Sequence, residues 1–247
     1  MKSCSWWTPK AKSAWTNWLD ILGVSDDTIR RDLQNLEQRK LLLRTHGGAI
    51  SIVLLAQETP FVNRTNAHVG AKSRIGRAAA KLISDGETLI VNGGSTTFAF
   101  AANLRTHRNL TVVTDNVAML SILPPEALQD VYLLGGQYRL DLGSTMGLVG
   151  FSSEAINVDT AVLGVIGLTA KDGISATLLE EASMLGQMIR RARRAIVVAD
   201  GSKFGVNAIA QIAPLDIIDI LVSDVSPPPD FCQALNKANV ELIVTPF

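Results

Sequence analysis

A series of short apolar stretches, rich in β-branched residues, constrains the fold of this chain more than any other feature. These stretches are ETLIVNGG, LTVVTDN, VYLLGGQY, TAVLGVIGL, AIVVADGSKFG, DILVSD and VELIVTPF. Segments with a helical pattern, AKSRIGRAAAKLI, STTFAFAANLR and the start VAMLSIL, lie before and between them. Apolar strands that alternate with helices are typical of a parallel sheet with helices on both faces. The sequence therefore predicts a parallel-sheet α/β domain over residues 67–247.

A different pattern precedes this domain. In SDDTIRRDLQNLEQRK, Ile29, Leu33 and Leu36 recur at i, i+4 and i+7, which predicts a helix with one buried stripe. Ser25 is suited to cap the first turn of that helix. The stretch LLLRTHGGAI that follows is expected to form a β-hairpin. Residues 51–66 are expected to be a connector.

Arg30 and Arg31 lie off the apolar stripe, in the first two turns of the predicted helix. A recognition helix has this arrangement, because its first residues enter the major groove while its stripe packs on a preceding helix. Arginine can pair there with guanine or with phosphate. On periodicity alone, a solvent-exposed helix with pairs such as Asp27–Arg31 is the simpler explanation. The hairpin that follows shifts the balance toward a winged helix-turn-helix.

The distribution of charge bears on the class of partner. Residues 1–50 carry eight Lys and Arg against five Asp and Glu, a net of +3, although the whole chain is neutral. This mild asymmetry favours an anionic partner for the first part of the chain, while random scatter of surface charge stays open as an alternative.

Cysteine usage and hydropathy bear on the compartment. The two distant cysteines, Cys4 and Cys232, predict neither a disulfide framework nor a metal site, and they favour a cytoplasmic protein. Since apolar runs stay shorter than about 18 residues, we expect no membrane span. We also expect no signal peptide.

Glycines and hydroxyl side chains follow the first strand of the large domain. Ser95, Thr96 and Thr97 come after Gly93 and Gly94 and open a helix. Backbone amides and hydroxyls in such a turn can hold an anion. A plain helix cap with a tight turn is the alternative. The pattern matches neither the dinucleotide motif nor the P-loop motif.

Further polar loops follow other predicted strands. They hold Asp115 with Asn116, Gly135 with Gly136, and Lys203 in DGSKFG. In an open parallel sheet, ligands bind outside the carboxyl ends of the strands, so these loops are expected to share a site. Lys203 would supply a positive charge for a phosphate, although an ordinary surface lysine is also consistent with the sequence.

The stretch VSDDTIRRDLQNLEQRKLLLRTHGGA closely resembles the DNA-binding signature of the DeoR family of bacterial transcriptional regulators. This resemblance implies a winged helix-turn-helix over residues 20–50. It also implies that DNA is contacted by Ser25, Thr28, Arg30, Arg31, Arg44 and His46. The resemblance ends near Asp20, and residues 1–19 contain all four tryptophans of the chain. We hypothesise that residues 1–19 are a frameshifted or mis-started reading, which would leave the DNA-binding domain partial.

The large domain resembles the effector domain of the same family, itself similar to the ribose-5-phosphate isomerase fold. The matching elements are GSTT, TDN, LGG and DGSKFG, at residues 94–97, 114–116, 134–136 and 200–205. The resemblance implies a phosphorylated sugar as effector, with its phosphate held by Ser95, Thr96, Thr97 and Lys203. The full implied site is Gly94, Ser95, Thr96, Thr97, Asp115, Asn116, Gly135, Gly136 and Lys203. Ile166 and the pair Leu185-Gly186 replace polar residues that relatives often carry.

The resemblance thus implies a repressor of a carbohydrate catabolic operon that binds a DNA operator, responds to a sugar phosphate and forms a homo-oligomer. No cofactor or metal is expected. A sugar-phosphate isomerase is disfavoured because the loop at 164–168 lacks the carboxylate that such chemistry needs, which leaves only Asp115 or Glu181. A ligand-binding or oligomerisation module with impaired DNA binding is a third possibility.

Overall fold

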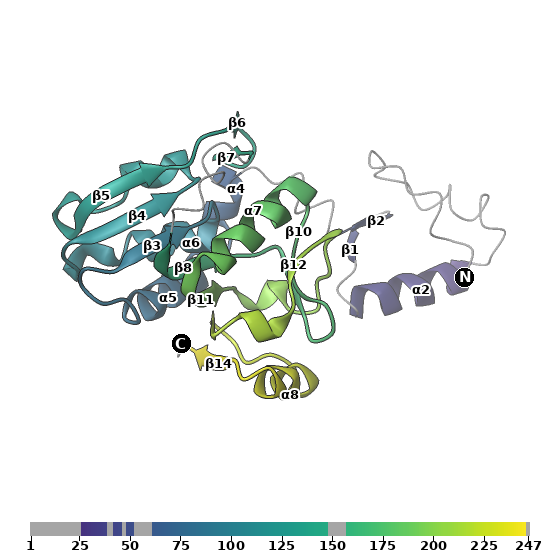
Figure 1. The fold of residues 1–247 in the computed structure, drawn as a ribbon. Coiled ribbons are helices and arrows are strands. Elements are labelled where there is room, and N and C mark those ends of the chain that lie inside the picture. The colour runs from purple at the N-terminus through teal and green to yellow at the C-terminus, as the bar shows by residue number, and fades with distance from the viewer. Residues whose placement is uncertain (1–25, 39–41, 46–47, 52–60, 148–156, 246–247) are drawn as a thin grey trace. The chain divides into compact units, whose positions relative to one another are not determined.

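The computed structural model describes residues 26–38, 42–45, 48–51, 61–147 and 157–245. The chain divides into two compact units, Met1–Glu58 and Thr59–Phe247 (Figure 1). The second unit therefore begins within the segment that the sequence predicts to be a connector.

The first unit contains helix α2 (Asp26–Gln38) and a hairpin of strands β1 (Leu42–Thr45) and β2 (Gly48–Ser51). Ile29 and Leu33 are buried and Leu36 is half-buried, so the predicted apolar stripe is confirmed. The hairpin is antiparallel, with Thr45 opposite Gly48, as the sequence predicts.

The core of the second unit is a sheet of seven parallel strands in the order β14-β13-β11-β8-β3-β4-β5 (Figure 1). This confirms the predicted parallel α/β fold. The strands are β3 (Thr88–Val91), β4 (Leu110–Thr114), β5 (Leu128–Leu133), β8 (Val158–Gly164), β11 (Ala192–Val198), β13 (Ile220–Ser223) and β14 (Glu241–Val244).

Helices cover both faces of this sheet because successive strand residues point to opposite sides. Leu89 and Val91 of β3 belong to one core, which also contains residues of α5 (Val69–Ala80) and α6 (Ser95–Ala101). Ile90 belongs to a second core, built with residues of α7 (Leu179–Arg190) and α8 (Pro229–Lys237). Among the described helices, none is long and apolar enough to span a bilayer.

The strand order reverses between β3 and β8. The chain passes outward from β3 through β4 to β5, then returns to add β8 on the other side of β3 and continues to β14. In an open parallel sheet, the carboxyl ends of the two strands at such a reversal diverge into loops that leave room for a ligand. The loops after β3 and β8 are therefore the natural place for a site.

Several smaller elements were not evident from the sequence. One small antiparallel sheet contains β9 (Gly167–Thr169), β10 (Gly173–Ala176) and β12 (Ala210–Ala213). A second one pairs β6 (Gln137–Arg139) with β7 (Ser144–Met146). Helix α4 (Phe61–Asn66) lies in the predicted connector. The helix predicted at VAMLSIL is only the 3-10 helix η2 (Val117–Ser121), since two prolines follow closely. The other 3-10 helices are η1 (Leu104–Thr106), η3 (Pro125–Ala127), η4 (Gly201–Lys203) and η5 (Leu215–Ile217).

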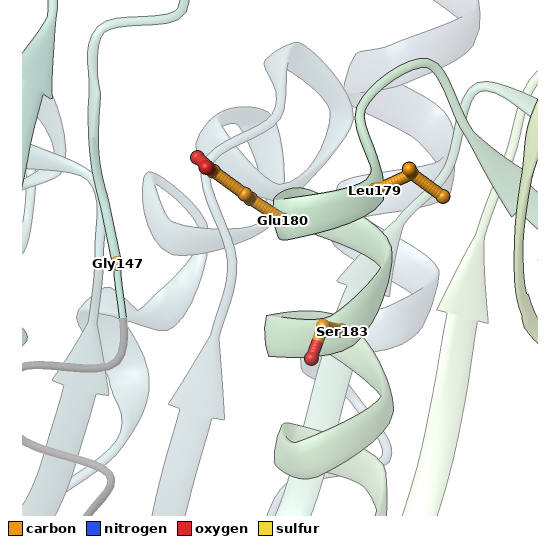
Figure 2. Close-up of a pocket in the computed structure, with 4 residues that line it drawn as sticks. All are labelled: Gly147, Leu179, Glu180 and Ser183. Carbon is orange, nitrogen blue, oxygen red and sulfur yellow. The ribbon is translucent and has the colours of Figure 1, made fainter.

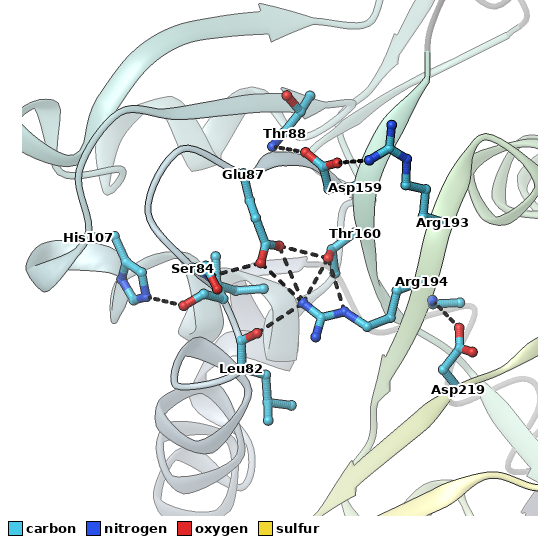
Figure 3. Close-up of polar contacts among 12 residues, drawn as sticks. Leu82, Ser84, Glu87, Thr88, His107, Asp159, Thr160, Arg193, Arg194 and Asp219 are labelled. Carbon is cyan, nitrogen blue, oxygen red and sulfur yellow. Dashed lines mark hydrogen bonds and ion pairs between the residues drawn. The ribbon is translucent and has the colours of Figure 1, made fainter.

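A polar network joins the amino ends of the central strands, at the edge opposite the reversal loops (Figure 3). Arg194 Nη2 donates to Leu82 O at 2.9 Å and to Thr160 Oγ1 at 3.0 Å, and it lies 3.3 Å from Glu87 Oε2. Thr160 Oγ1 donates to Glu87 Oε2 at 2.8 Å. The network ties β8 and β11 to the loop that leads into β3.

We predict that Arg194→Met lowers the free energy of unfolding by about 1–3 kcal/mol, because it leaves the largely buried Glu87 carboxylate without its cation. The matched control is Arg193→Met. The Arg193 side chain is 84% exposed and pairs with Asp159 at 3.2 Å, and loss of such a pair costs about 1 kcal/mol or less. Urea unfolding followed by circular dichroism measures both variants, and equal losses would contradict the prediction.

Candidate functional site

The centre of the site is Asn92, which directly follows β3 and is 2% exposed. Its Nδ2 donates to Gly164 O at 2.9 Å, and its Oδ1 accepts from Gly164 N at 2.8 Å. One side-chain amide therefore binds both backbone groups of the last residue of β8. This pair fixes the carboxyl ends of β3 and β8 side by side at the strand reversal.

The turn after Asn92 brings the backbone close to its neighbours. A Cβ atom at Gly93 would lie 1.7 Å from Ser144 Oγ, so no larger residue fits there without movement. Thr97 Oγ1 lies 2.7 Å from Asn92 O and 2.9 Å from Gly94 O, so the hydroxyl donates its single proton to backbone carbonyls of the turn. Thr97 thus has a structural role in this turn.

The other two hydroxyl residues of the turn lie at the start of α6. Thr96 is buried and Ser95 is half-buried. No hydrogen bond engages either side chain within the described part of the chain. Unlike the Thr97 hydroxyl, these two hydroxyls are therefore not used to hold the turn.

Two carboxyl groups face this region. Asp115 follows β4 and is 3% exposed, and burial raises its pKa to about 7 against the amide hydrogen bonds of Asp115 and Gly93, with the charge of Glu181 adding to the rise. Burial also raises the pKa of Glu181 on α7, while the Arg64 guanidinium opposes that rise. Each acid is therefore held in surroundings that disfavour its charge.

Three cations form the other side of the site. Lys72 of α5 is buried, and its Nζ donates to Arg64 O at 2.5 Å and to Ala67 O at 2.7 Å. Burial lowers the pKa of Lys72, of Lys203 in η4 and of Arg64 in α4. The charge of Asp200 favours the protonated form of both lysines.

Asp200 is the counter-ion within this cation cluster. It is 3% exposed, and its carboxylate accepts bonds from the Ser202 amide at 3.0 Å and from the Ser202 hydroxyl. Burial acts to raise the pKa of Asp200, but the Ser202 bonds and the charges of Lys203 and Lys72 outweigh it and leave this pKa below its ordinary value. The Asp200 carboxylate therefore offsets part of the charge of Lys72 and Lys203, and Glu181 and Asp141 offset part of that of Arg64.

Unsatisfied polar atoms gather in the same region. Buried side-chain atoms without a hydrogen-bond partner among the described residues include Arg64 Nε and Nη2, Asp115 Oδ1, Asn116 Nδ2, Ser144 Oγ and Glu181 Oε2. Such atoms are rare in folded proteins and require an explanation where they occur. Donors and acceptors in this number can bind a ligand that carries several hydroxyl groups.

The structure brings together most of the residues that the sequence singles out for the large domain. The turn at 94–97, Asp115 and Asn116 meet around Gly93 and Ser144, and Lys203 joins the cation cluster. Gly135 and Gly136 lie in an exposed segment after β5. Gly136 has φ 140° and packs on the Met146 carbonyl, so it shapes the start of the β6–β7 hairpin.

Sequence reasoning missed four residues of this site, which are Arg64, Lys72, Asn92 and Ser144, and it considered Glu181 only as a base for the disfavoured isomerase. A signal existed for Lys72, because it shares the buried face of α5 with Ile75 and Ala79. A lysine in an apolar stripe is unusual and points to a specific partner. No comparable signal marks Arg64 or Glu181.

A separate hollow of about 420 Å³ lies at the start of α7 (Figure 2). Gly147, Leu179, Glu180 and Ser183 line it. Among the described residues, this lining includes one acid, Glu180, and no cation. The cation cluster is the better anion site.

In the first unit, Thr28, Arg30 and Arg31 are exposed on α2, while Ile29 and Leu33 are buried. Arg44 lies on β1. Ser25 and His46, two further predicted DNA contacts, lie outside the described residues, as do residues 1–19.

Comparison with known proteins gives matches over both units. A model of the DeoR-like helix-turn-helix domain matches residues 17–53, and a model of the DeoR C terminal sensor domain matches residues 67–225. The HTH-type transcriptional repressor GlcR of Bacillus subtilis (strain 168) is 35% identical over 229 residues, which cover 91% of this chain and 87% of GlcR. The glycerol-3-phosphate regulon repressor of Escherichia coli (strain K12) is 32% identical over 226 residues, which cover 91% of this chain and 89% of that repressor.

Solved structures match more distantly. eIF2B beta from Chaetomium thermophilum matches with a TM-score of 0.49 and 13% identity, over 69% of this chain and 54% of that chain. Ribose 5-phosphate isomerase A from Methanocaldococcus jannaschii matches with a TM-score of 0.40 and 15% identity, over 56% of this chain and 55% of that chain.

We predict that Gly93→Ala lowers the free energy of unfolding by about 1–3 kcal/mol, because the new methyl group overlaps the Ser144 side chain. Ser144→Gly removes the overlapping atoms. The double variant should therefore be more stable than the sum of the two single effects implies. Urea unfolding of the four proteins measures this coupling, and strictly additive losses would contradict it.

We predict that the stability of the protein depends on pH through Asp115. The folded-state pKa lies above the ordinary 3.8, so the stability that this group contributes is complete at low pH and is lost as pH rises toward 7. Asp115→Asn cannot titrate, so its stability relative to the parent protein should increase by about 2 kcal/mol between about pH 5 and about pH 8. Urea unfolding at the two pH values tests this, and an unchanged difference would refute it.

Proposed function

We infer the function from one premise, which is that this chain belongs to the DeoR family of transcriptional regulators. It carries the helix-turn-helix domain and the sensor domain of that family in this order. We propose that it represses transcription by binding operator DNA through its first unit. We propose further that a phosphorylated sugar, bound in the second unit, controls DNA binding.

The observation that supports DNA recognition is the division of α2 into two sides. Ile29 and Leu33 are buried, and Thr28, Arg30 and Arg31 of the first two turns are exposed. A recognition helix needs its first turns exposed to reach the base edges and phosphates of the major groove. Ser25, Arg44 and His46 are further proposed contacts. Because paired half-sites are read by paired domains, we also propose that the protein acts as a homo-oligomer.

The observation that carries the ligand proposal is the pairing of a cation cluster with unsatisfied polar atoms. Arg64, Lys72 and Lys203 offer positive charge to a phosphate. Asp115 and Asn116 are among the residues that offer hydrogen bonds to hydroxyl groups. A phosphate ester of a polyol has both features. One relative is named a glycerol-3-phosphate regulon repressor, and glycerol 3-phosphate is a phosphate ester of a polyol.

We divide the remaining predicted effector residues into those that contact the ligand and those that support the loops around it. We propose that Ser95 and Thr96 contact the phosphate, together with the amides of the turn at Gly94. Thr97 supports that turn through its bonds to Asn92 O and Gly94 O. Gly135 and Gly136 support the neighbouring hairpin.

We propose that the protein is not an enzyme, as its named relatives are repressors. Position 166, after β8, holds a buried isoleucine and so offers no base for an isomerase. One observation favours the alternative, because a carboxyl group with a pKa near 7, such as Asp115, is suited to proton transfer. An isomerase assay with pentose and amino-hexose phosphates tests that alternative, and turnover would contradict our proposal.

The proposed function is tested by fluorescence anisotropy with DNA from upstream of the gene of this protein, at two salt concentrations and with a panel of sugar phosphates. We expect salt-sensitive binding that one sugar phosphate changes. Arg31→Gln should weaken binding, and it should flatten the salt slope by about one unit if Arg31 contacts a phosphate. Lys203→Met should bind DNA normally and lose the response to the sugar phosphate.

The control for both variants is Arg77→Gln, because Arg77 is exposed on α5. This variant should match the parent protein in DNA binding and in the ligand response. Absence of DNA binding by the parent protein at low salt would contradict the repressor proposal and favour a ligand-binding module with impaired DNA binding. A full response by Lys203→Met would contradict the assignment of Lys203.

A further inference from the structure

Helix α4 is the first described element of the second unit. Residues 52–60 connect it to β2, the last described strand of the first unit. Its amino end is anchored, because Phe61 N donates to Asp141 O at 2.9 Å. The Phe61 ring is buried and meets the Phe98 ring of α6 edge-on, at a centroid distance of 5.6 Å. The start of α4 is therefore fixed to the body of the second unit.

The Lys72 side chain of α5 binds the carboxyl end of α4. Lys72 Nζ donates to Arg64 O and to Ala67 O, carbonyl groups at the end of the helix. A cation is favoured at this position because the last carbonyls of a helix carry partial negative charge. An ammonium group has three protons, so these two bonds leave one proton of Lys72 for another acceptor.

The Arg64 side chain is poorly satisfied in the same place. Its Nε and Nη2 are buried and have no hydrogen-bond partner among the described residues. The charges of Arg64, Lys72 and Lys203 oppose one another, while Glu181 and Asp141 offset part of the Arg64 charge. Without a ligand, α4 thus places the Arg64 guanidinium near Lys72 and Lys203, and the buried Nε and Nη2 of Arg64 make no hydrogen bond with the described residues.

On the basis of the proposed function, we propose that Arg64 binds the phosphate of the ligand and that occupancy of the site thereby orders α4. A phosphate dianion among the three cations would accept bonds from Arg64 of α4, from the third proton of Lys72 and from Lys203. It would convert their mutual repulsion into attraction. The ligand then cross-links α4 to α5 and η4.

A phosphate-binding role for Arg64 and a purely structural role predict different responses of α4 to ligand. If Arg64 only balances the charge of Glu181, its replacement changes stability but leaves the exchange response of α4 to ligand intact. If Arg64 binds the phosphate, the α4 amides become protected when ligand binds, and this protection depends on Arg64. The two roles are therefore separable by amide exchange.

The test is hydrogen–deuterium exchange of the full chain, read by mass spectrometry, with sn-glycerol 3-phosphate, glucose 6-phosphate and inorganic phosphate as probes. Calorimetry measures the binding of each probe. We expect a bound probe to slow exchange in residues 61–67 by about threefold or more, together with protection of residues 92–97. Lys72→Met without ligand should exchange faster in residues 61–67 than the parent protein.

Arg64→Met should bind the same probe more weakly, protect residues 92–97 at saturation and lose the protection of residues 61–67. Arg64→Lys is the second variant in case Arg64→Met folds poorly, and it should show partial protection because it retains the charge without the guanidinium fork. Arg77→Met is the control on the exposed side of α5 and should behave as the parent protein.

Protection of residues 92–97 without any change in residues 61–67 would overturn the role of α4 and leave the proposed function intact. The same holds if Arg64→Met retains full protection of residues 61–67. If no probe binds and no segment changes its exchange, the proposed phosphate ligand itself is refuted, and the role of α4 is refuted with it.

Discussion

The reciprocal pair between the Asn92 amide and the backbone of Gly164 is the interaction on which the site depends. It lies where the strand order reverses, between β3 and β8. The ladder between β3 and β8 ends at Val91 and Val162, and the Asn92 pair extends the contact between the two strands to Gly164, next to the turn at Gly93. A buried amide that satisfies both its donor and its acceptor function at a strand reversal sets position accurately, because hydrogen bonds are directional.

The site combines groups that would each destabilise a fold on its own. Asp115 and Glu181 are carboxyl groups whose pKa is raised by burial, and Lys72 and Lys203 are amines whose pKa is lowered by burial. Proteins retain such groups where function requires them, and perturbed pKa values cluster at functional sites. Here the positive charge lies on Arg64, Lys72 and Lys203, while Asp115 and Asn116 carry unsatisfied polar atoms, a combination that suits a ligand with an anionic end and a hydroxylated end.

The first unit followed its local sequence pattern more closely than the second. The stripe of Ile29 and Leu33 and the hairpin after it are decided by residues close in the chain, so periodicity was sufficient to predict them. The seven strands of the large sheet were also predictable, because buried parallel strands need continuous apolar stretches. The small antiparallel sheets and α4 were missed, since their pairing and packing partners lie elsewhere in the sequence.

The sequence by itself determined the family, the fold class, the helix α2 and the glycine turn, because each depends on a contiguous motif or a local period. Only the tertiary structure decided which charged residues meet. Arg64, Lys72 and Glu181 come from three helices, and nothing in their local sequence says that they are neighbours. Periodicity shows which face of a helix is buried, but it does not show which residues pack against that face. Those neighbours are set by the parallel sheet, whose strand order reverses at β3 and β8.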